Sequence, residues 1–275
     1  MKVNKEVEII KENLKEYPFI KCYLGDIIDQ RLKIESYEYG MLTAPLLDGE
    51  PFKPNLMRLE DALKIGEAKC TDFKYIFRER KLPSKDKAID SEIINILAEV
   101  KTVELLHKYR FKDITKIKPK KDAKTVDFTA NRNNQNYAVE VTRLGLASSA
   151  RKKPKLDKLS RPPLLTIISS NKPQNMNRIV NDIYGEVIDK YPQVREFCQR
   201  QGDVWRGILV ISNGRDYFVV CRYENKLYEI QPSTVHKMLK QEWKSLKEGQ
   251  EYECLHHILI TMGKDLSKAI IYPEL

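Results

Sequence analysis

The chain of 275 residues lacks the features that mark several large classes of protein. Its five cysteines are scattered and include no CxxC pair, which argues against a disulfide framework and against a zinc ribbon. No run approaches the roughly 20 apolar residues of a membrane span. The N-terminus, MKVNKEVEIIKENLKEY, has no continuous apolar stretch of the kind found in signal peptides. We therefore expect a soluble, cytoplasmic protein that does not associate with membranes.

The common glycine motifs are also missing. The sequence contains no GxxxxGK[ST] loop, no GxGxxG fingerprint and no GxSxG elbow, which argues against the most frequent nucleotide-binding and serine-hydrolase classes. The histidines show no ligand-like spacing, and the adjacent His256 and His257 would point to opposite faces of a strand. We expect structural roles for all of them.

Positive charge is abundant. Lys and Arg number 49 against 39 Asp and Glu, a net charge of +10, which favours a polyanionic partner such as nucleic acid. Two basic runs, residues 108–124 and 151–161, carry much of this excess, and the alternative interpretation is that they are solvated loops. The candidates for nucleic-acid contact are Lys120, Lys121, Lys124, Arg143, Arg151, Lys152, Lys153 and Lys155.

Hydrophobic periodicity predicts the elements of an α/β protein. Helices are expected at 3–16, 58–68, 91–109, 177–200 and 231–247, and strands at 113–117, 125–130, 137–142, 207–212, 217–222 and 257–261. Residues 27–39 contain strand-like pieces, and Asp90 or Ser91 is a plausible N-cap. From residue 91 the order predicts a mixed central sheet flanked by helices on both faces. We expect an N-terminal extension or subdomain at 1–87 and a core domain with C-terminal additions at 88–275.

Two acidic residues flank a predicted hairpin. Asp127 lies near the start of one strand and Glu140 near the end of the next, with the polar turn 131–136 between them. If the strands pair antiparallel, the two carboxylates can meet at one end of the sheet. Such oxygen ligands suit a hard divalent cation.

The order of elements, together with VDF at 126–128 and VEVTR at 139–143, resembles the PD-(D/E)XK nuclease superfamily, the restriction-endonuclease-like fold. The resemblance covers residues 91–212 and implies an αβββαβ core. It implies that Asp127 and Glu140 bind Mg²⁺, with Mn²⁺ as an alternative, and that Glu99 adds a metal contact, with Glu104 as the competing candidate. The superfamily's lysine falls at Thr142. Some members are similar in having EVT there and take a basic residue from the following helix.

In that helix Lys190 is the candidate for the basic residue, with Gln193 one turn further on. The resemblance thus implies a Mg²⁺-dependent deoxyribonuclease, in a defence, restriction or mobile-element setting, and leaves a homodimer open. One alternative is a nuclease-like fold that has lost catalysis and serves as a nucleic-acid- or protein-binding module. A third hypothesis is an interaction protein of an unrelated α/β fold. The form of the nucleic acid, DNA or RNA and single- or double-stranded, is left open by the sequence.

Overall fold

The described part of the chain, in a computed structural model, comprises residues 2–33, 42–77, 86–118, 125–143, 173–202, 204–212, 254–261 and 270–272. Its α-helices are α1 (Lys2–Leu14), α2 (Pro18–Arg31), α3 (Thr43–Asp48), α4 (Lys53–Lys69), α5 (Asp86–Lys108) and α7 (Pro173–Gln201). Two short 3₁₀ helices are η2 (Glu50–Phe52) and η3 (Phe73–Ile76). The strands are β1 (Cys70–Thr71), β2 (Lys112–Lys116), β3 (Phe128–Arg132), β4 (Gln135–Arg143), β5 (Arg206–Ser212), β6 (Leu255–Thr261) and β7 (Ile270–Tyr272).

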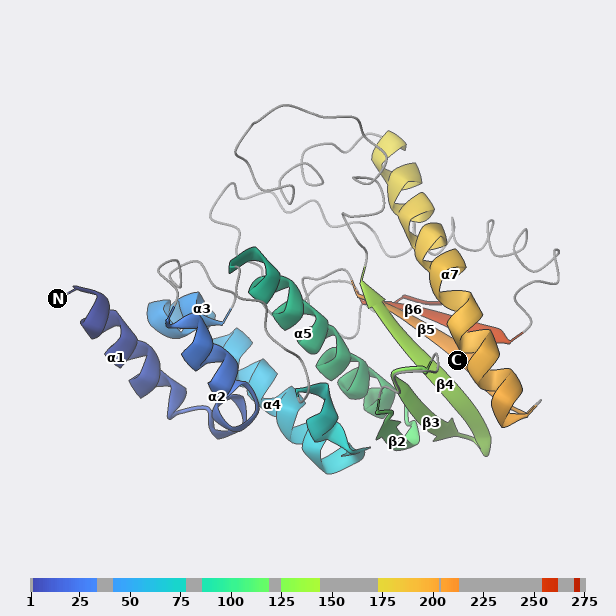
Figure 1. Ribbon diagram of the computed structural model, residues 1–275, viewed down its shortest axis with the longest axis horizontal. Coiled ribbons are helices and arrows are strands. Elements are labelled where there is room, and N and C mark those ends of the chain that lie inside the picture. The colour runs from blue at the N-terminus through green and yellow to red at the C-terminus, as the bar shows by residue number, and fades with distance from the viewer. Residues whose placement is uncertain are drawn as a thin grey trace.

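The strands form one mixed sheet in the order β1-β2-β3-β4-β5-β6-β7. β1 pairs with β2 in parallel, and β4, β5 and β6 are mutually parallel, whereas β3 runs antiparallel to both of its neighbours. The sheet lies between α5 on one side and α7 on the other (Figure 1). The predicted α/β class, with a mixed sheet flanked by helices, is therefore confirmed.

The predicted hairpin is the connection between β3 and β4. Arg132 pairs with Gln135, so the loop consists of Asn133 and Asn134, with φ angles of 53° and 61°. A two-residue loop with positive φ at both positions suits the right-handed twist of the strands, and Asn tolerates this conformation better than most residues. The Asn-rich sequence thus encodes the turn.

Side chains alternate along β4 between two cores. Tyr137 and Val139 belong to the large hydrophobic core on the α5 side, whereas Ala138 belongs to a smaller core with Val194 and Phe197 of α7. Since neighbouring strand residues point to opposite faces, the even-numbered residues that follow Ala138 are directed toward α7.

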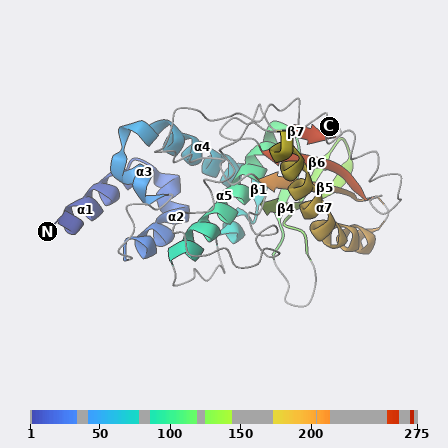
Figure 2. The same cartoon turned by 90° about the horizontal axis from the view of Figure 1, so that it is seen from above.

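The N-terminal helices extend the larger core. Buried leucines and isoleucines of α1 to α4, among them Ile10, Leu24, Leu46 and Leu59, belong to the same hydrophobic cluster as Leu105 of α5. Figures 1 and 2 show these helices gathered beside α5, on the side away from α7. β1, which follows α4 directly, adds an edge strand to the sheet beside β2.

Some details of the sequence prediction are wrong. Residues 27–31 are not strand-like but belong to α2, whose buried residues Ile20, Leu24, Ile27, Ile28 and Arg31 recur at helical spacing. Asp90 and Ser91 lie inside α5, which begins at Asp86. The second predicted strand, 125–130, is a strand only from Phe128.

Other predicted elements lie outside the described residues. These are the basic run at 151–161, the strand at 217–222, the helix at 231–247 and the part of the strand-like region from 34 to 39. Among the helices of the described ranges, none has the length and apolar character needed to cross a membrane.

The contact between α7 and the sheet gives a stability prediction. A Cβ atom at Gly207 would lie 2.5 Å from Val194 Cγ1 and 2.8 Å from the carbonyl oxygen of Cys254, so Gly207→Ala should destabilise the fold by about 1–3 kcal/mol. Gly185 of α7 is the matched control, because a Cβ there meets nothing within 4 Å. Gly185→Ala should stabilise by about 0.5–1 kcal/mol. Urea unfolding measures both, and equal effects of the two substitutions would contradict the packing described.

Candidate functional site

Charged side chains converge at one edge of the sheet, where β2 ends and β3 begins. β2 and β4 both run antiparallel to β3, so their later residues lie beside the first residues of β3. Lys116 ends β2, Asp127 directly precedes β3, and Glu140 lies in the second half of β4. α5 approaches this edge from one face of the sheet and α7 from the other (Figure 1).

Asp127 is held by both strands around it. Its Oδ1 accepts a hydrogen bond from Lys116 Nζ at 2.9 Å, and its Oδ2 accepts one from the backbone N–H of Val141 at 2.9 Å. Its own backbone N–H donates to the carbonyl oxygen of Val139 at 3.0 Å. The side chain is 24% exposed, so solvent and ligands can still reach it. The carboxylate is therefore oriented but accessible.

Lys116 joins Asp127 to α5. Its Nζ lies 2.7 Å from Glu99 Oε2 and 2.9 Å from Asp127 Oδ1, and 4.8 Å from the centroid of the Phe128 ring. Burial favours a lower pKa for Lys116, but Asp127 and Glu99 outweigh this effect and the pKa is raised. Lys116 is thus a buried ammonium between two carboxylates. On sequence it was one member of a basic run, although the alternation with buried Ile114 is a signal that it faces inward.

Glu140 is the most deeply buried acid of the site, at 2% exposure. Its Oε1 lies 2.9 Å from Lys190 Nζ, and its Oε2 accepts a hydrogen bond of 2.9 Å from Gln193 Nε2. Gln193 also donates to the carbonyl oxygen of Thr125, which ties α7 to the segment before Asp127. Burial, and then the negative charge of Asp127, raise the pKa of Glu140 to about 8, while Lys190 acts in the opposite direction.

α7 supplies three polar side chains, at positions 186, 190 and 193. Their spacing of four and three residues places them on one face of the helix. Lys190 and Gln193 contact Glu140, as described, and Glu186 Oε2 accepts a hydrogen bond of 2.6 Å from Thr142 Oγ1. Burial lowers the pKa of Lys190, but Glu140, Asp127 and Glu186 reverse the effect and raise it. Glu186 was missed on sequence, although its spacing of four from Lys190 was a usable signal.

The two acids proposed on α5 have different surroundings. Glu99 is 6% exposed and reaches Asp127 through the Lys116 ammonium. Glu104 lies 3.5 Å from Lys101, a lysine that is itself 1% exposed. Of the two candidates, Glu99 is therefore the one that the fold brings to the site.

The candidates for nucleic-acid contact are mostly beyond the described residues. Lys120, Lys121, Lys124, Arg151, Lys152, Lys153 and Lys155 all lie there. Arg143, at the end of β4, is described and partly buried. Burial lowers the pKa of its guanidinium, while the neighbouring Glu92 and Glu186 act in the opposite direction. Arg143 is therefore near the site but interacts with acids from α5 and α7.

The donor set at this edge fits Mg²⁺ in its chemistry. Asp127 and Glu140 are hard oxygen donors. Burial, and after it the negative charge of Asp127, raises the pKa of Glu140, and a cation near both carboxylates would relieve this repulsion. Among the residues that the structure describes, no group of three or more His, Cys, Asp or Glu side chains is placed to hold a metal ion. Mg²⁺ nevertheless often binds to one or two carboxylates and completes its shell with waters and substrate phosphates.

Comparisons of the chain with family models, with curated proteins and with solved structures find no match.

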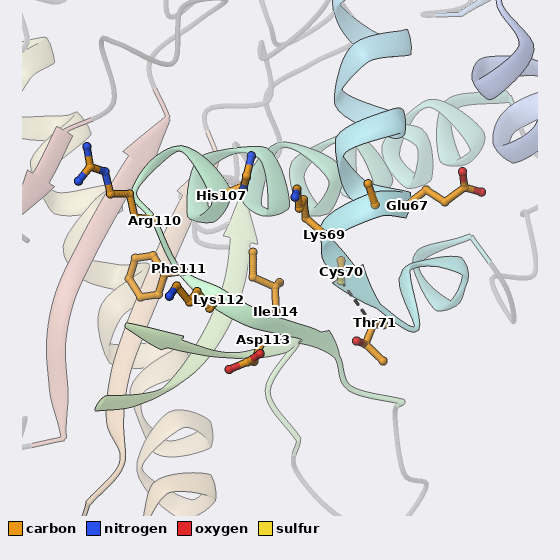
Figure 3. A pocket seen from close by; sticks show the side chains of 11 residues that line it. Glu67, Lys69, Cys70, Thr71, His107, Arg110, Phe111, Lys112, Asp113 and Ile114 are labelled. Carbon is orange, nitrogen blue, oxygen red and sulfur yellow. Dashed lines mark hydrogen bonds between the residues drawn. The ribbon is translucent and has the colours of Figure 1, made fainter. Parts of the chain in front are cut away.

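A separate cleft lies at the other end of β2. Its volume is about 760 Å³, and Figure 3 shows Lys69, His107, Arg110 and Lys112 around it. Lys69 ends α4, where its positive charge suits the exposed carbonyl groups of the helix end, and His107 lies in the last turn of α5. Lys112 and Ile114 place the cleft at the start of β2, so it is distinct from the site at Asp127.

Removing the Lys116 ammonium should destabilise the fold. In Lys116→Met the carboxylates of Glu99 and Asp127 lose their shared cation, and an uncompensated buried charge typically costs about 3–5 kcal/mol. Adding Glu99→Gln should restore part of the loss. Lys53→Met, at an exposed lysine that pairs with Glu50 at 3.3 Å, is the control and should leave the free energy of unfolding unchanged. Urea unfolding tests this, and equal behaviour of the two Met variants would refute a structural role for Lys116.

Stability should also depend on pH through Glu140. Its pKa rises from 4.5 to about 8 on folding, so the folded chain holds this proton more tightly than the unfolded chain does. Stability then falls as the pH rises from about 5 to about 8. We expect the wild type to lose stability relative to Glu140→Gln across this window, in urea titrations with EDTA present. A difference that stays constant with pH would show that Glu140 is already ionised.

Proposed function

We propose that the protein is a Mg²⁺-dependent nuclease that hydrolyses phosphodiester bonds of DNA. The observation that carries the proposal is the convergence of three side chains at one sheet edge: Asp127 directly before β3, Glu140 in β4 and Lys190 in α7. A net charge of +10 supports a polyanionic substrate. The resemblance of VDF and VEVTR to the PD-(D/E)XK nucleases agrees with this arrangement of side chains and with a polyanionic substrate.

The roles of the chain's own groups follow from their contacts. Asp127 and Glu140 would hold the Mg²⁺ ion, which when bound supplies Lewis-acid activation of water and neutralises charge on the phosphoryl oxygens. Glu140 must lose its proton to act as a ligand. The Val141 N–H orients Asp127, and Gln193 Nε2 orients Glu140. These hydrogen bonds therefore hold both carboxyl groups in position to bind a metal ion.

Lys190 would take the place of the strand lysine. It reaches Glu140 from α7, whereas the hydroxyl of Thr142 is engaged with Glu186. A lysine beside the metal-binding carboxylates can contact the scissile phosphate or orient the attacking water. Glu99 would act indirectly, by holding Lys116 against Asp127.

The proposal predicts a strict requirement for the two acids. Asp127→Asn and Glu140→Gln keep the size of the side chains but remove the negative charge, and each should slow cleavage of DNA with Mg²⁺ by about 10²-fold or more. Lys190→Met should cost about 10²–10⁴-fold. Glu196→Gln, an exposed acid of the same helix that is 4.0 Å from Arg200, is the matched control and should cleave normally.

Gel assays with labelled duplex and single-stranded DNA would measure these rates. Thermal unfolding would check that each variant is folded. Undiminished cleavage by a folded double variant, Asp127→Asn with Glu140→Gln, would rule out this site as the catalytic centre.

A second candidate function is a binding module without catalysis. Two ion pairs favour a binding module, because the ammonium groups of Lys116 and Lys190 lie 2.9 Å from Asp127 and Glu140 and would compete with a metal ion for these acids. Calorimetric titration with Mg²⁺ and Mn²⁺ separates the two functions. Metal binding that disappears in Asp127→Asn supports the nuclease, and an absence of metal binding supports the module.

A further inference from the structure

Tyr75 presents an aromatic ring beside two lysines at the same sheet edge. The ammonium of Lys74 lies 5.9 Å from the centroid of its ring, and that of Lys118 lies 5.5 Å from it. Both distances are within the range of cation–π interactions. Both lysines are exposed and the tyrosine is half-buried.

The local structure explains why this ring faces outward. η3 is a 3₁₀ helix, in which residues three apart share one side. Phe73 and Ile76 are buried on the inner side, and Phe73 packs edge-on against Tyr23 with ring centroids 5.3 Å apart. Lys74 and Tyr75 are left on the outer side. Tyr75 therefore lies on the outer side of η3, where it is half-buried.

Strand pairing brings this turn to the proposed catalytic edge. β1 and β2 are parallel, with Thr71 opposite Thr115, so the chain leaves β1 beside the position where β2 ends at Lys116. η3 follows at once and contacts both β2 and α5. Lys118 lies two residues beyond Lys116, the residue whose ammonium binds Asp127. The aromatic ring and the acidic site thus share one side of the molecule.

We propose that Tyr75, Lys74 and Lys118 form a binding site for single-stranded DNA, in which the tyrosine ring stacks on an unpaired base. The lysines contact the phosphates on either side of that base. The inference rests on the proposed nuclease function, since it names single-stranded or frayed DNA as the substrate class of that site. Nucleic-acid channels commonly combine aromatic platforms with a basic groove, because every base has a face that can stack.

Binding of fluorescent oligonucleotides in EDTA tests the proposal without cleavage. The probes are an oligodeoxyadenylate and a chain of abasic sites with the same length and charge. Tyr75→Leu should weaken binding of the oligodeoxyadenylate by roughly tenfold and leave binding of the abasic chain unchanged. Tyr75→Phe should bind like the wild type, since it keeps the ring.

The lysines are tested through the dependence of binding on salt. Lys74→Ala and Lys118→Ala should each reduce the slope of log K against log salt by about 0.7, for both probes. Lys53→Ala, at an exposed lysine of α4 with the same charge, is the control and should leave the slope unchanged.

Two results would overturn the proposal. One is a Tyr75→Leu variant that binds both probes like the wild type, and the other is an equal loss on both probes, which would show that no base is stacked. Neither result depends on catalysis. Normal duplex cleavage with unchanged binding by Tyr75→Leu would reject the stacking site and keep the nuclease. Loss of base-dependent binding in a protein that never cleaves DNA would keep the stacking site and reject the nuclease.

Discussion

The register of the β3–β4 hairpin is the constraint on which the site depends. With Asn133 and Asn134 in the loop, Phe128 lies opposite Val139, and the N–H of Val141 reaches the Asp127 carboxylate. A shift of one residue would turn Glu140 away from α7 and into the apolar core that α5 covers, because side chains alternate along a strand. The burial of Tyr137 and Val139 on that side opposes such a shift. The same hydrophobic pattern that stabilises the sheet therefore also positions the acids.

Charge balance is the second organising feature. Glu99, Lys116 and Asp127 form one chain of ion pairs, and Glu140 with Lys190 forms another, on the α5 and α7 sides of the sheet. Buried carboxylates and ammonium groups are tolerated when each has a partner of opposite charge and its remaining atoms are hydrogen-bonded. Gln193 donates a hydrogen bond to the second oxygen of Glu140, and the Val141 N–H donates one to the second oxygen of Asp127. The result is a polar centre whose acids are held by ion pairs and hydrogen bonds within the chain.

The N-terminal helices help to build the sheet edge at which this polar centre lies. Their apolar side chains share one core with α5, and α4 leads directly into β1 and then η3. Parallel pairing of β1 with β2 carries the chain past the end of β2, so Tyr75 and its lysines arrive next to Lys116. A region whose chemistry is obscure in the sequence thus places an aromatic ring and positive charge near the acids.

The sequence by itself determined the α/β class, the hairpin, the helices at α4, α5 and α7, and the two acids around the turn, because local periodicity and turn chemistry encode all of these. It also pointed to Lys190 and Gln193, through family resemblance. Only the tertiary structure decided that Lys116 is buried between Glu99 and Asp127, that Glu186 binds Thr142, and that Tyr75 lies at this edge. These contacts join residues that are distant in sequence, because strand pairing and helix packing bring the residues together. A lysine in a basic run looks solvated until the fold places carboxylates on both sides of it.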